Sequence, residues 1–505
     1  MKRSRLEYKS GFTIVELLVA IAVIAILAAV TYVGYNGIQS RSRISTLVTD
    51  LRTAASQLET YRSNNGGYPT TASVVNNNQG FKASNGVTFT YKYGSSSTYC
   101  LSATSSFANI AKYKITNQST EPQIGDCTVV LALQAIDDSC AIASGKVFCW
   151  GYNYYGTVGD GTTNNSLVPV VVTDSGVLAG KTVTAVSRGN NHTCVIADGQ
   201  PVCWGDNSNG QLGDSTTASS LVPVAFTTNT ALAGKTVTAI STGGGHTCAI
   251  ANGQVYCWGR NTFGQLGNGT TTNSFLPVAV DTSGVLAGKT VTAMSSGNNH
   301  VCVVASGQAY CWGETYNGAI GDGTAIGSFT TRTSPVAVTV ASGVLAGKTV
   351  TAVSSDSNNT CVVASGQAFC WGKNSSGQIG DGTKVDRTSP VAVISSGVLA
   401  GKTVTDINTG SNHVCVIASS QAYCWGYNQN GQIGDNTYTE RLSPVAVISS
   451  GVLSGKTITA ISSGGQSNCV LASAQVYCWG YNQFGNVGDG TVFNRPTPVS
   501  ISPLP

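Results

Sequence analysis

The chain has 505 residues, of which only 10% are charged, and its formal net charge is +4. Typical soluble domains carry roughly 25% charged residues, so this composition predicts a neutral surface and excludes the strong basic stripe that nucleic-acid binding requires. The 60 glycines and 16 cysteines favour turn-rich β structure with disulfides, and the length predicts two or three domains.

A basic segment and a long apolar run occupy the N-terminus. Four basic residues lie within positions 2–9, and the apolar run 12–33 contains a single charge, Glu16. As a helix, this run would span roughly 33 Å, which is enough to cross a bilayer. A secretory signal peptide would have a shorter apolar core with its cleavage site after it, whereas Gly11 precedes the run here. The alternative is an ordinary signal anchor with Glu16 at the membrane interface.

The residues from Gly11 onwards, GFTIVELLVAIAVIAILA, resemble the N-terminal signature of type IV pilins and type II secretion pseudopilins. The resemblance implies cleavage between Gly11 and Phe12 by a prepilin peptidase, followed by N-methylation of Phe12. It also implies that Glu16 pairs with the amino terminus of a neighbouring subunit during assembly. A carboxylate costs about 3 kcal/mol at the centre of a membrane helix, so its presence suggests such a partner. Residues 1–11 would then be a cleaved leader.

Residues 12–64 are expected to form one long helix, membrane-spanning in its first part. After Gly37, apolar residues recur at three- and four-residue steps from Ile44 to Tyr61, as on one face of an amphipathic helix. The sequence NNGGYP at 64–69 ends the helix, because Gly, Asn and Pro stop helical backbone angles.

Residues 65–127 are expected to form a small α+β body of the pilin type. Alternating stretches at 87–93 and 111–115 predict strands. Cys100 and Cys127 are the only cysteines outside the repeats described next, so we expect them to pair with each other. Two free thiols are the alternative.

Residues 128–505 contain seven repeats, each with the landmark Cys-Trp-Gly. Successive landmark tryptophans are 54 or 59 residues apart. Four short β-runs per unit, at a period near 50, predict an all-β propeller of seven blades. In the second unit these runs are 182–186, 193–197, 201–204 and 222–226. The landmark residues are Trp150, Trp204, Trp258, Trp312, Trp371, Trp425 and Trp479.

Each repeat also contains two cysteines nine positions apart. Between Cys194 and Cys203, the dipeptide Asp198-Gly199 predicts a two-residue hairpin turn, and counting outward places the cysteines opposite each other at a non-hydrogen-bonded pair. The Cα atoms of such a pair are about 4.5 Å apart, within disulfide range. We expect one cross-strand disulfide per blade, with buried thiols as the alternative. The pairs are Cys140–Cys149, Cys194–Cys203, Cys248–Cys257, Cys302–Cys311, Cys361–Cys370, Cys415–Cys424 and Cys469–Cys478.

The Gly-Gln-Leu/Ile-Gly-Asp-Gly-Thr loops, for example at Gln211, Leu212 and Gly213, and the repeated His-x-Cys resemble the propeller of the regulator of chromosome condensation family and its secreted bacterial relatives. The resemblance implies the fold of residues 128–505. It implies little about function, because this fold hosts unrelated binding tasks. The exchange-factor role of the nuclear members transfers poorly to an exported chain.

The four histidines, His192, His246, His300 and His413, lie two residues before the first cysteine of their units. A residue repeated around a ring is expected to be a structural hydrogen bonder rather than a catalyst or a metal ligand. The single aspartates of the Gly-Asp-Gly-Thr loops are expected to be turn residues, since calcium needs six or more oxygen ligands. No catalytic set stands apart from the repeat, so we expect no enzyme activity, no cofactor and no metal.

The position directly after Cys-Trp-Gly varies between units while its neighbours do not. Equivalent loops emerge on one face of a propeller, so this variation predicts a recognition surface for a glycan or a protein, with neutral drift as the alternative. Further aromatic residues nearby are Tyr154, Tyr155, Phe263, Tyr316 and Phe484. The variable residues, each directly after the landmark glycine, are Tyr152, Asp206, Arg260, Glu314, Lys373, Tyr427 and Tyr481.

The sequence therefore predicts a minor or tip subunit of a type IV pilus-type filament that presents a propeller for adhesion or surface recognition. The alternative is a pseudopilin or envelope component of a type II secretion or DNA-uptake machine. Expected partners are other pilin subunits through the N-terminal helix, the prepilin peptidase, the membrane before assembly and an extracellular glycan or protein. We expect one helix in the bacterial cytoplasmic membrane, an extracytoplasmic head and assembly into a cell-surface filament.

Overall fold

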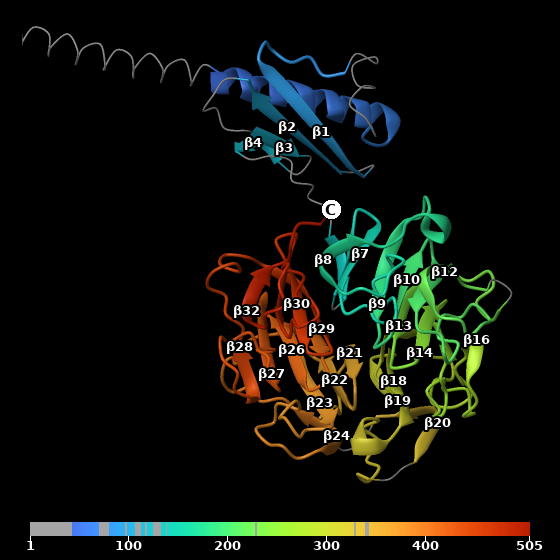
Figure 1. The fold of residues 1–505 in the computed structure, drawn as a ribbon. Coiled ribbons are helices and arrows are strands. Elements are labelled where there is room, and N and C mark those ends of the chain that lie inside the picture. Colours follow the sequence, from blue (N-terminus) through green and yellow to red (C-terminus); the bar gives the residue numbers. More distant parts are fainter. Residues whose placement is uncertain are drawn as a thin grey trace, which may run out of the picture. The chain divides into compact units, whose positions relative to one another are not determined.

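A computed structural model describes the chain as two compact units, Met1–Leu131 and Ala132–Pro505 (Figure 1). The predicted leader and apolar run lie outside the described residues. Among the residues that are described, no helix is both long and apolar enough to cross a membrane. The described ranges are 43–69, 80–95, 98–106, 113–116, 119–124, 133–137, 139–227, 230–327, 330–338 and 343–504.

The first unit contains a helix at residues 43–65 and a four-stranded antiparallel sheet in the order β1-β2-β3-β4. Leu47, Leu51 and Leu58 on the predicted apolar face are buried, and they share a core with Leu101 and Ile115 of the sheet. The strands are β1 (Val87–Ser95), β2 (Thr98–Ser105), β3 (Tyr113–Thr116) and β4 (Ser119–Ile124).

The predicted helix end at residue 64 agrees closely with the observed end at 65, and its part before residue 43 lies outside the description. The strands expected at 87–93 and 111–115 correspond to β1 and β3, whereas β2 and β4 were not predicted. Whether this unit is a pilin body stays a prediction.

The second unit is a ring of seven antiparallel sheets of four strands, so the predicted propeller is confirmed (Figure 1). In each sheet, or blade, the strands follow one another along the chain from the innermost to the outermost. Blades are numbered 1–7 in chain order. The strands of blades 1–3 are β5 (Leu133–Asp137), β6 (Cys140–Ala143), β7 (Lys146–Gly151), β8 (Ser166–Val171); β9 (Val183–Arg188), β10 (His192–Ala197), β11 (Gln200–Gly205), β12 (Ser220–Ala225); β13 (Val237–Thr242), β14 (His246–Ala251), β15 (Gln254–Gly259) and β16 (Ser274–Ala279).

The remaining blades repeat this arrangement, and short 3-10 turns lie at η2 (Gly176–Leu178) and η3 (Tyr316–Gly318). Inner strand β29 of the last blade packs against β5 of the first, which closes the ring. The strands of blades 4–7 are β17 (Val291–Ser296), β18 (His300–Ala305), β19 (Gln308–Glu314), β20 (Thr331–Ala337); β21 (Val350–Asp356), β22 (Asn359–Ala364), β23 (Gln367–Gly372), β24 (Arg387–Ala392); β25 (Val404–Thr409), β26 (His413–Ala418), β27 (Gln421–Gly426), β28 (Arg441–Ala446); β29 (Ile458–Gly464), β30 (Ser467–Ala472), β31 (Gln475–Gly480) and β32 (Arg495–Ser500).

The landmark tryptophans join each blade to the one before it. Trp204 of blade 2 is fully buried and donates its indole N–H to the carbonyl of Thr157 in blade 1 over 2.9 Å. Gly159 of blade 1 has a φ of +77°, and a Cβ there would lie 2.6 Å from Trp204 Nε1. The repeated glycine is therefore required by both its backbone angle and the approach of the next blade. The same indole-to-carbonyl bond is made by Trp150, Trp258, Trp312, Trp371, Trp425 and Trp479.

Within each blade, a disulfide joins the two middle strands. Asp198 and Gly199 both have positive φ, 48° and 73°, as a type I′ turn requires. The resulting register places Cys194 opposite Cys203, with Cα atoms 4.1 Å apart. The seven pairs expected from the repeats are the seven disulfides of the propeller structure.

Each outermost strand contains a proline close to its centre. Proline has no backbone N–H to offer to another strand, so it is tolerated at such an edge and interrupts the row of exposed donors. The seven residues are Pro169, Pro223, Pro277, Pro335, Pro390, Pro444 and Pro498.

Candidate recognition site

The variable residues lie in equivalent backbone positions at one end of the ring. Each ends or directly follows the third strand of its blade, and in blades 2–7 its amide is bonded to the loop between the first two strands. Asp206 N, for example, donates to the carbonyl of Asn191 over 2.8 Å. The structure thus brings the predicted face together, and the same bond holds Arg260, Glu314, Lys373, Tyr427 and Tyr481.

In six of the blades, the loop that carries the variable residue is built around a buried asparagine, and blade 4 has Thr315 in its place. In blade 1, Asn153 Nδ2 donates to the carbonyls of Thr162 and Asn164, and its Oδ1 accepts from the amide of Val158 at 2.8 Å. Asp160 Oδ1 accepts from the amide of Thr162 at 2.9 Å, which is the arrangement of an Asx turn. These bonds make the loop a firm support for the residues it displays.

The charged variable residues of blades 2–5 are engaged by neighbours on the same face. Gln211 Nε2 donates to Asp206 Oδ2 over 2.9 Å, and Asn299 Nδ2 donates to Glu314 Oε2 over 2.9 Å. Lys373 Nζ lies 3.3 Å from Asn412 Oδ1. The Arg260 guanidinium lies 5.2 Å from the ring centre of Phe263, at cation–π distance.

Blades 6, 7 and 1 carry tyrosine at the variable position, and two of these rings form a cluster. The Phe484 ring centre lies 5.2 Å from that of Tyr152 and 5.9 Å from that of Tyr481. We call Tyr152, Tyr481 and Phe484 the aromatic seam, because it joins the last blade to the first. Burial raises the pKa of the Tyr152 and Tyr481 phenols, so both are neutral at pH 7. Tyr154, beside the seam, is 67% exposed.

A cavity of about 520 Å³ lies at the centre of the ring, and the aromatic seam borders it through Tyr152. Hydroxyl groups link neighbouring inner strands around its wall, as where Ser187 Oγ and Thr242 Oγ1 are 3.0 Å apart. Asn190, from a loop of the recognition face, lines the cavity as well, so the cavity opens towards that face.

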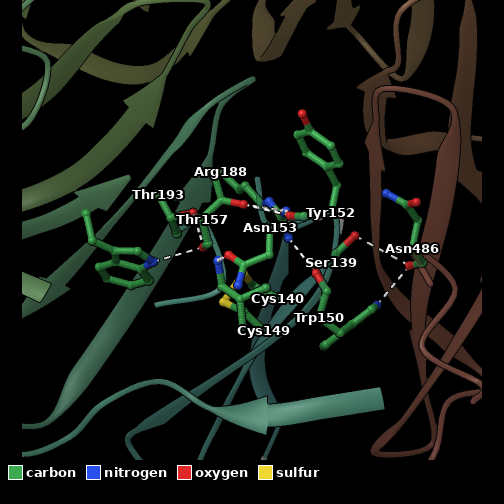
Figure 2. The surroundings of a disulfide bond; sticks show 12 residues. Ser139, Cys140, Cys149, Trp150, Tyr152, Asn153, Thr157, Arg188, Thr193 and Asn486 are labelled. Atoms are coloured by element: carbon green, nitrogen blue, oxygen red, sulfur yellow. Dashed lines mark hydrogen bonds between the residues drawn. A yellow bond between two sulfur atoms is a disulfide. The ribbon is translucent and has the colours of Figure 1, made fainter. Parts of the chain in front are cut away.

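Arg188 fixes the loop of blade 1 beside the cavity and was not singled out from the sequence. Its guanidinium donates to the carbonyls of Trp150 and Tyr152, at 2.7 and 2.5 Å, and to Thr157 Oγ1 at 2.9 Å (Figure 2). Figure 2 also shows the Tyr152 ring directed away from the Cys140–Cys149 disulfide. The sequence does distinguish Arg188 from the repeat, because blades 3–7 have only Ser or Thr at the equivalent position.

Asp406 is a second residue that the sequence analysis missed. It lines the cavity, where blades 2–5 and 7 have alanine at the equivalent position. Burial raises the pKa of its carboxyl to about 6, and the amide of Ile407 donates to its Oδ1 over 2.9 Å.

The histidines lie buried between blades, where they bond to the next blade. His192 Nε2 is 2.8 Å from Thr247 Oγ1, and His413 Nε2 is 2.8 Å from Asn468 Oδ1. His246 differs from His192. The position equivalent to Thr247, the partner of His192, is Val301 in the next blade, which has no hydroxyl. Neither ring nitrogen of His246 therefore has a hydrogen-bond partner among the described residues. Within the described ranges, no group of three or more His, Cys, Asp or Glu side chains is arranged to hold a metal ion.

Several predicted site residues lie outside the description. These are Gly11, Phe12 and Glu16 of the leader region, together with Cys127 and the side chain of Cys100. Cleavage, methylation, the assembly role and the Cys100–Cys127 bridge therefore stay predictions.

Sequence comparison finds two kinds of family model in this chain. The regulator of chromosome condensation (RCC1) repeat matches residues 144–196, 198–250, 252–304, 365–417, 419–471 and 473–505. The prokaryotic N-terminal methylation motif matches residues 8–32.

Individual relatives are more distant. The chain is 29% identical to the ultraviolet-B receptor UVR8 of Arabidopsis thaliana, over 63% of this chain and 70% of that protein. It is 27% identical to the E3 ubiquitin-protein ligase HERC2 of Homo sapiens, over 68% of this chain but only 7% of that protein. Among solved structures, human WBSCR16 superposes with a TM-score of 0.60 at 20% identity, covering 71% of this chain and 94% of that one. Yeast RCC1 (Prp20), bound to Kap60, gives 0.61 at 17% identity, covering 74% and 86%. These structural likenesses concern the fold alone.

Proposed function

Because this chain belongs to the family of RCC1-repeat proteins and carries a prepilin methylation motif, we propose that it is a minor or tip subunit of a type IV pilus-type filament. The observation that carries the proposal is the presence of both matches in one chain. A pilin-like protein with a propeller head is membrane-anchored before assembly and surface-exposed after it. The head serves adhesion or surface recognition and binds rather than catalyses.

The recognition role is supported by a contrast between the repeated polar residues, which are bonded within the propeller, and the variable residues at one end of it. The histidines and the loop aspartates are buried or bonded within the ring, as His192 is to Thr247 and Asp160 to Thr162. Variation is concentrated at one end, where backbone bonds hold differing side chains in equivalent positions. A binding surface is the function that this division supports best, since loops on a rigid scaffold commonly carry recognition.

The first experiment locates the propeller on intact cells with a gold-labelled antibody and electron microscopy. We expect label on extended filaments, concentrated at their tips. Label confined to the cell envelope would overturn the pilus assignment and favour a pseudopilin of a secretion or DNA-uptake machine.

A second experiment tests processing. Mass spectrometry of the mature chain is expected to find N-methylated Phe12 as the first residue. Gly11→Val should leave the leader uncut, while Ser10→Ala, one residue away, should be processed normally. Removal of the leader from Gly11→Val would contradict the assigned cleavage site.

A further inference from the structure

We propose that the aromatic seam, Tyr152, Tyr481 and Phe484, binds an uncharged glycan beside the mouth of the central cavity. This inference rests on the proposed recognition role and names its ligand class. The seam combines rings, which can lie against the apolar face of a sugar, with amide groups, which can bond its hydroxyls.

The three aromatic side chains form one surface, and this surface exists because the last blade of the propeller meets the first. Tyr481 and Phe484 come from blade 7 and Tyr152 comes from blade 1, and Phe484 lies within 5.9 Å of both tyrosine rings. Phe484 is 38% exposed. Tyr154 and Tyr155, whose ring centres are 5.0 Å apart, extend the aromatic surface along the loop of blade 1. Several adjacent rings suit an oligosaccharide better than a single small molecule.

Charged groups of blades 5–7 are paired within the protein, and the Arg188 guanidinium beside Tyr152 is bonded to the carbonyls of Trp150 and Tyr152 and to Thr157 Oγ1. In blade 7, Arg495 pairs with Asp489, and in blade 6, Arg441 pairs with Asp435. Lys384 of blade 5 pairs with Glu440 of blade 6. The groups offered to a ligand are therefore rings, hydroxyls and amides, which favour an uncharged ligand over an acidic one.

Amide groups close to the rings are available for sugar hydroxyls. Tyr427 and Tyr481 donate their hydroxyls to Gln429 and Gln483, at 2.9 and 3.0 Å, which orients two side-chain amides at the surface. Asn190 lines the cavity, as Tyr152 does, and its exposed amide donates to Asn298 Oδ1 over 3.2 Å.

Asn486 gives an independent reason to place a ligand here. Four blades have glutamine at the position of Asn486. In each of them the glutamine Oε1 accepts a hydrogen bond from a backbone amide of the same loop. Gln211 Oε1, for example, accepts from the amide of Asn209 at 2.9 Å. Asn486 is one methylene shorter, it lines the cavity, and its buried Oδ1 has no partner among the described residues. An unpaired buried acceptor is costly, and a rotation of this side chain into the cavity that Asn486 lines would let it accept from a ligand hydroxyl.

The test measures binding of three uncharged tetrasaccharides, cellotetraose, chitotetraose and maltotetraose, to the full chain in detergent micelles by saturation-transfer NMR and calorimetry. We expect saturable binding of at least one of them. Tyr152→Ala and Tyr481→Ala should each weaken that binding tenfold or more. Tyr438→Ala, at an exposed tyrosine of blade 6 that is not one of the variable residues, should leave it unchanged.

Asn486→Gln is the conservative test of the proposed acceptor. The variant restores the side chain that four other blades have, so it should fold normally and yet bind the tetrasaccharide more weakly. No binding of any tetrasaccharide at millimolar concentration would overturn the inference, and so would equal weakening by Tyr438→Ala.

Attachment of filament-bearing cells separates this inference from the proposed function. If no tetrasaccharide binds but Tyr152→Ala/Tyr481→Ala abolishes attachment, the glycan assignment fails and a protein ligand takes its place. If gold label is confined to the envelope while a tetrasaccharide still binds, the filament role fails and the glycan site stands.

Discussion

Trp150 in the first blade donates its indole N–H to the backbone carbonyl of Asn486 in the last blade, over 2.8 Å. The other six tryptophans make the same bond between blades that are also joined by the chain. Blades 1 and 7 have no such chain connection and are held by contacts alone, which include Ser139 Oγ at 3.4 Å from the same carbonyl and the amide of Gly490 at 2.9 Å from the carbonyl of Leu167. The ring is therefore closed without a strand that crosses from one blade to the other, because all four strands of each terminal blade are consecutive.

The first prediction concerns this closure. Trp150→Phe removes the donor and is expected to cost about 1–3 kcal/mol of unfolding free energy, because the carbonyl of Asn486 loses a buried bond. Hydrogen exchange should accelerate mainly in blades 1 and 7. Trp312→Phe removes the same bond inside the ring and should not expose the terminal blades selectively. Indistinguishable exchange patterns in the two variants would argue against a special role for the closure.

The second prediction concerns His246, which lacks a partner because Val301 occupies the place of Thr247 in the preceding pair. Val301→Thr should add about 1 kcal/mol of stability. The new hydroxyl can accept from His246 and donate to the Gln265 carbonyl, as Thr247 donates to Gln211 at 2.9 Å. The urea unfolding midpoint measures the change. The reciprocal variant Thr247→Val should lower it, and a shift of both variants in one direction would contradict the pairing.

The third prediction separates two reasons for a repeated glycine. Gly180→Ala imposes a positive φ of +69° on alanine where nothing lies within 4 Å, so about 1–2 kcal/mol should be lost. Gly159→Ala has a similar φ but meets Trp204, and a further 1–3 kcal/mol is expected from overpacking. Thermal unfolding of the two variants compares them directly. Equal losses would show that the contact with the next blade is unimportant.

The fourth prediction concerns acid. Burial lowers the pKa of His192, His300 and His413 to about 4 and that of His246 to about 3. The unfolded chain, with ordinary values near 6.5, therefore binds more protons than the folded chain below that pH. Stability is fully present above about pH 6.5 and falls towards pH 4, by up to about 3 kcal/mol per histidine.

Urea unfolding at pH 7, 5.5 and 4.5 measures this loss. His300→Asn introduces the residue that blade 5 has at the equivalent position, Asn359. In this variant the loss of stability between pH 7 and pH 4.5 should be smaller by the contribution of one histidine. An unchanged pH dependence in this variant would mean that His300 does not titrate on unfolding.

The repeats allowed much of the propeller to be predicted, because a strand pattern that is correct for one repeat applies to all seven. The turn at Asp198-Gly199 determines the register, and the register determines that Cys194 meets Cys203. The helix end near residue 65 followed from Gly and Pro. The periodicity of a single unit therefore contains the information for each blade.

Contacts between blades could not be predicted in the same way. Val301 affects His246 because the two side chains face each other across neighbouring blades. The repeat period does not determine which positions of two neighbouring blades face each other. The ring contact of Tyr152 with Phe484 arises only when the last blade meets the first. Arg188 and Asp406 were visible as departures from the repeat, but only the structure shows that both line the central cavity.

The prolines of the outer strands have a consequence for encounters between two propellers of this protein. Each head exposes seven strand edges, and an uninterrupted edge would invite backbone pairing with the next molecule and growth of an intermolecular sheet. A proline near the middle of every outer strand, such as Pro223 in β12 or Pro444 in β28, breaks each edge into segments too short to template that growth. Two propellers that meet edge to edge can then separate again.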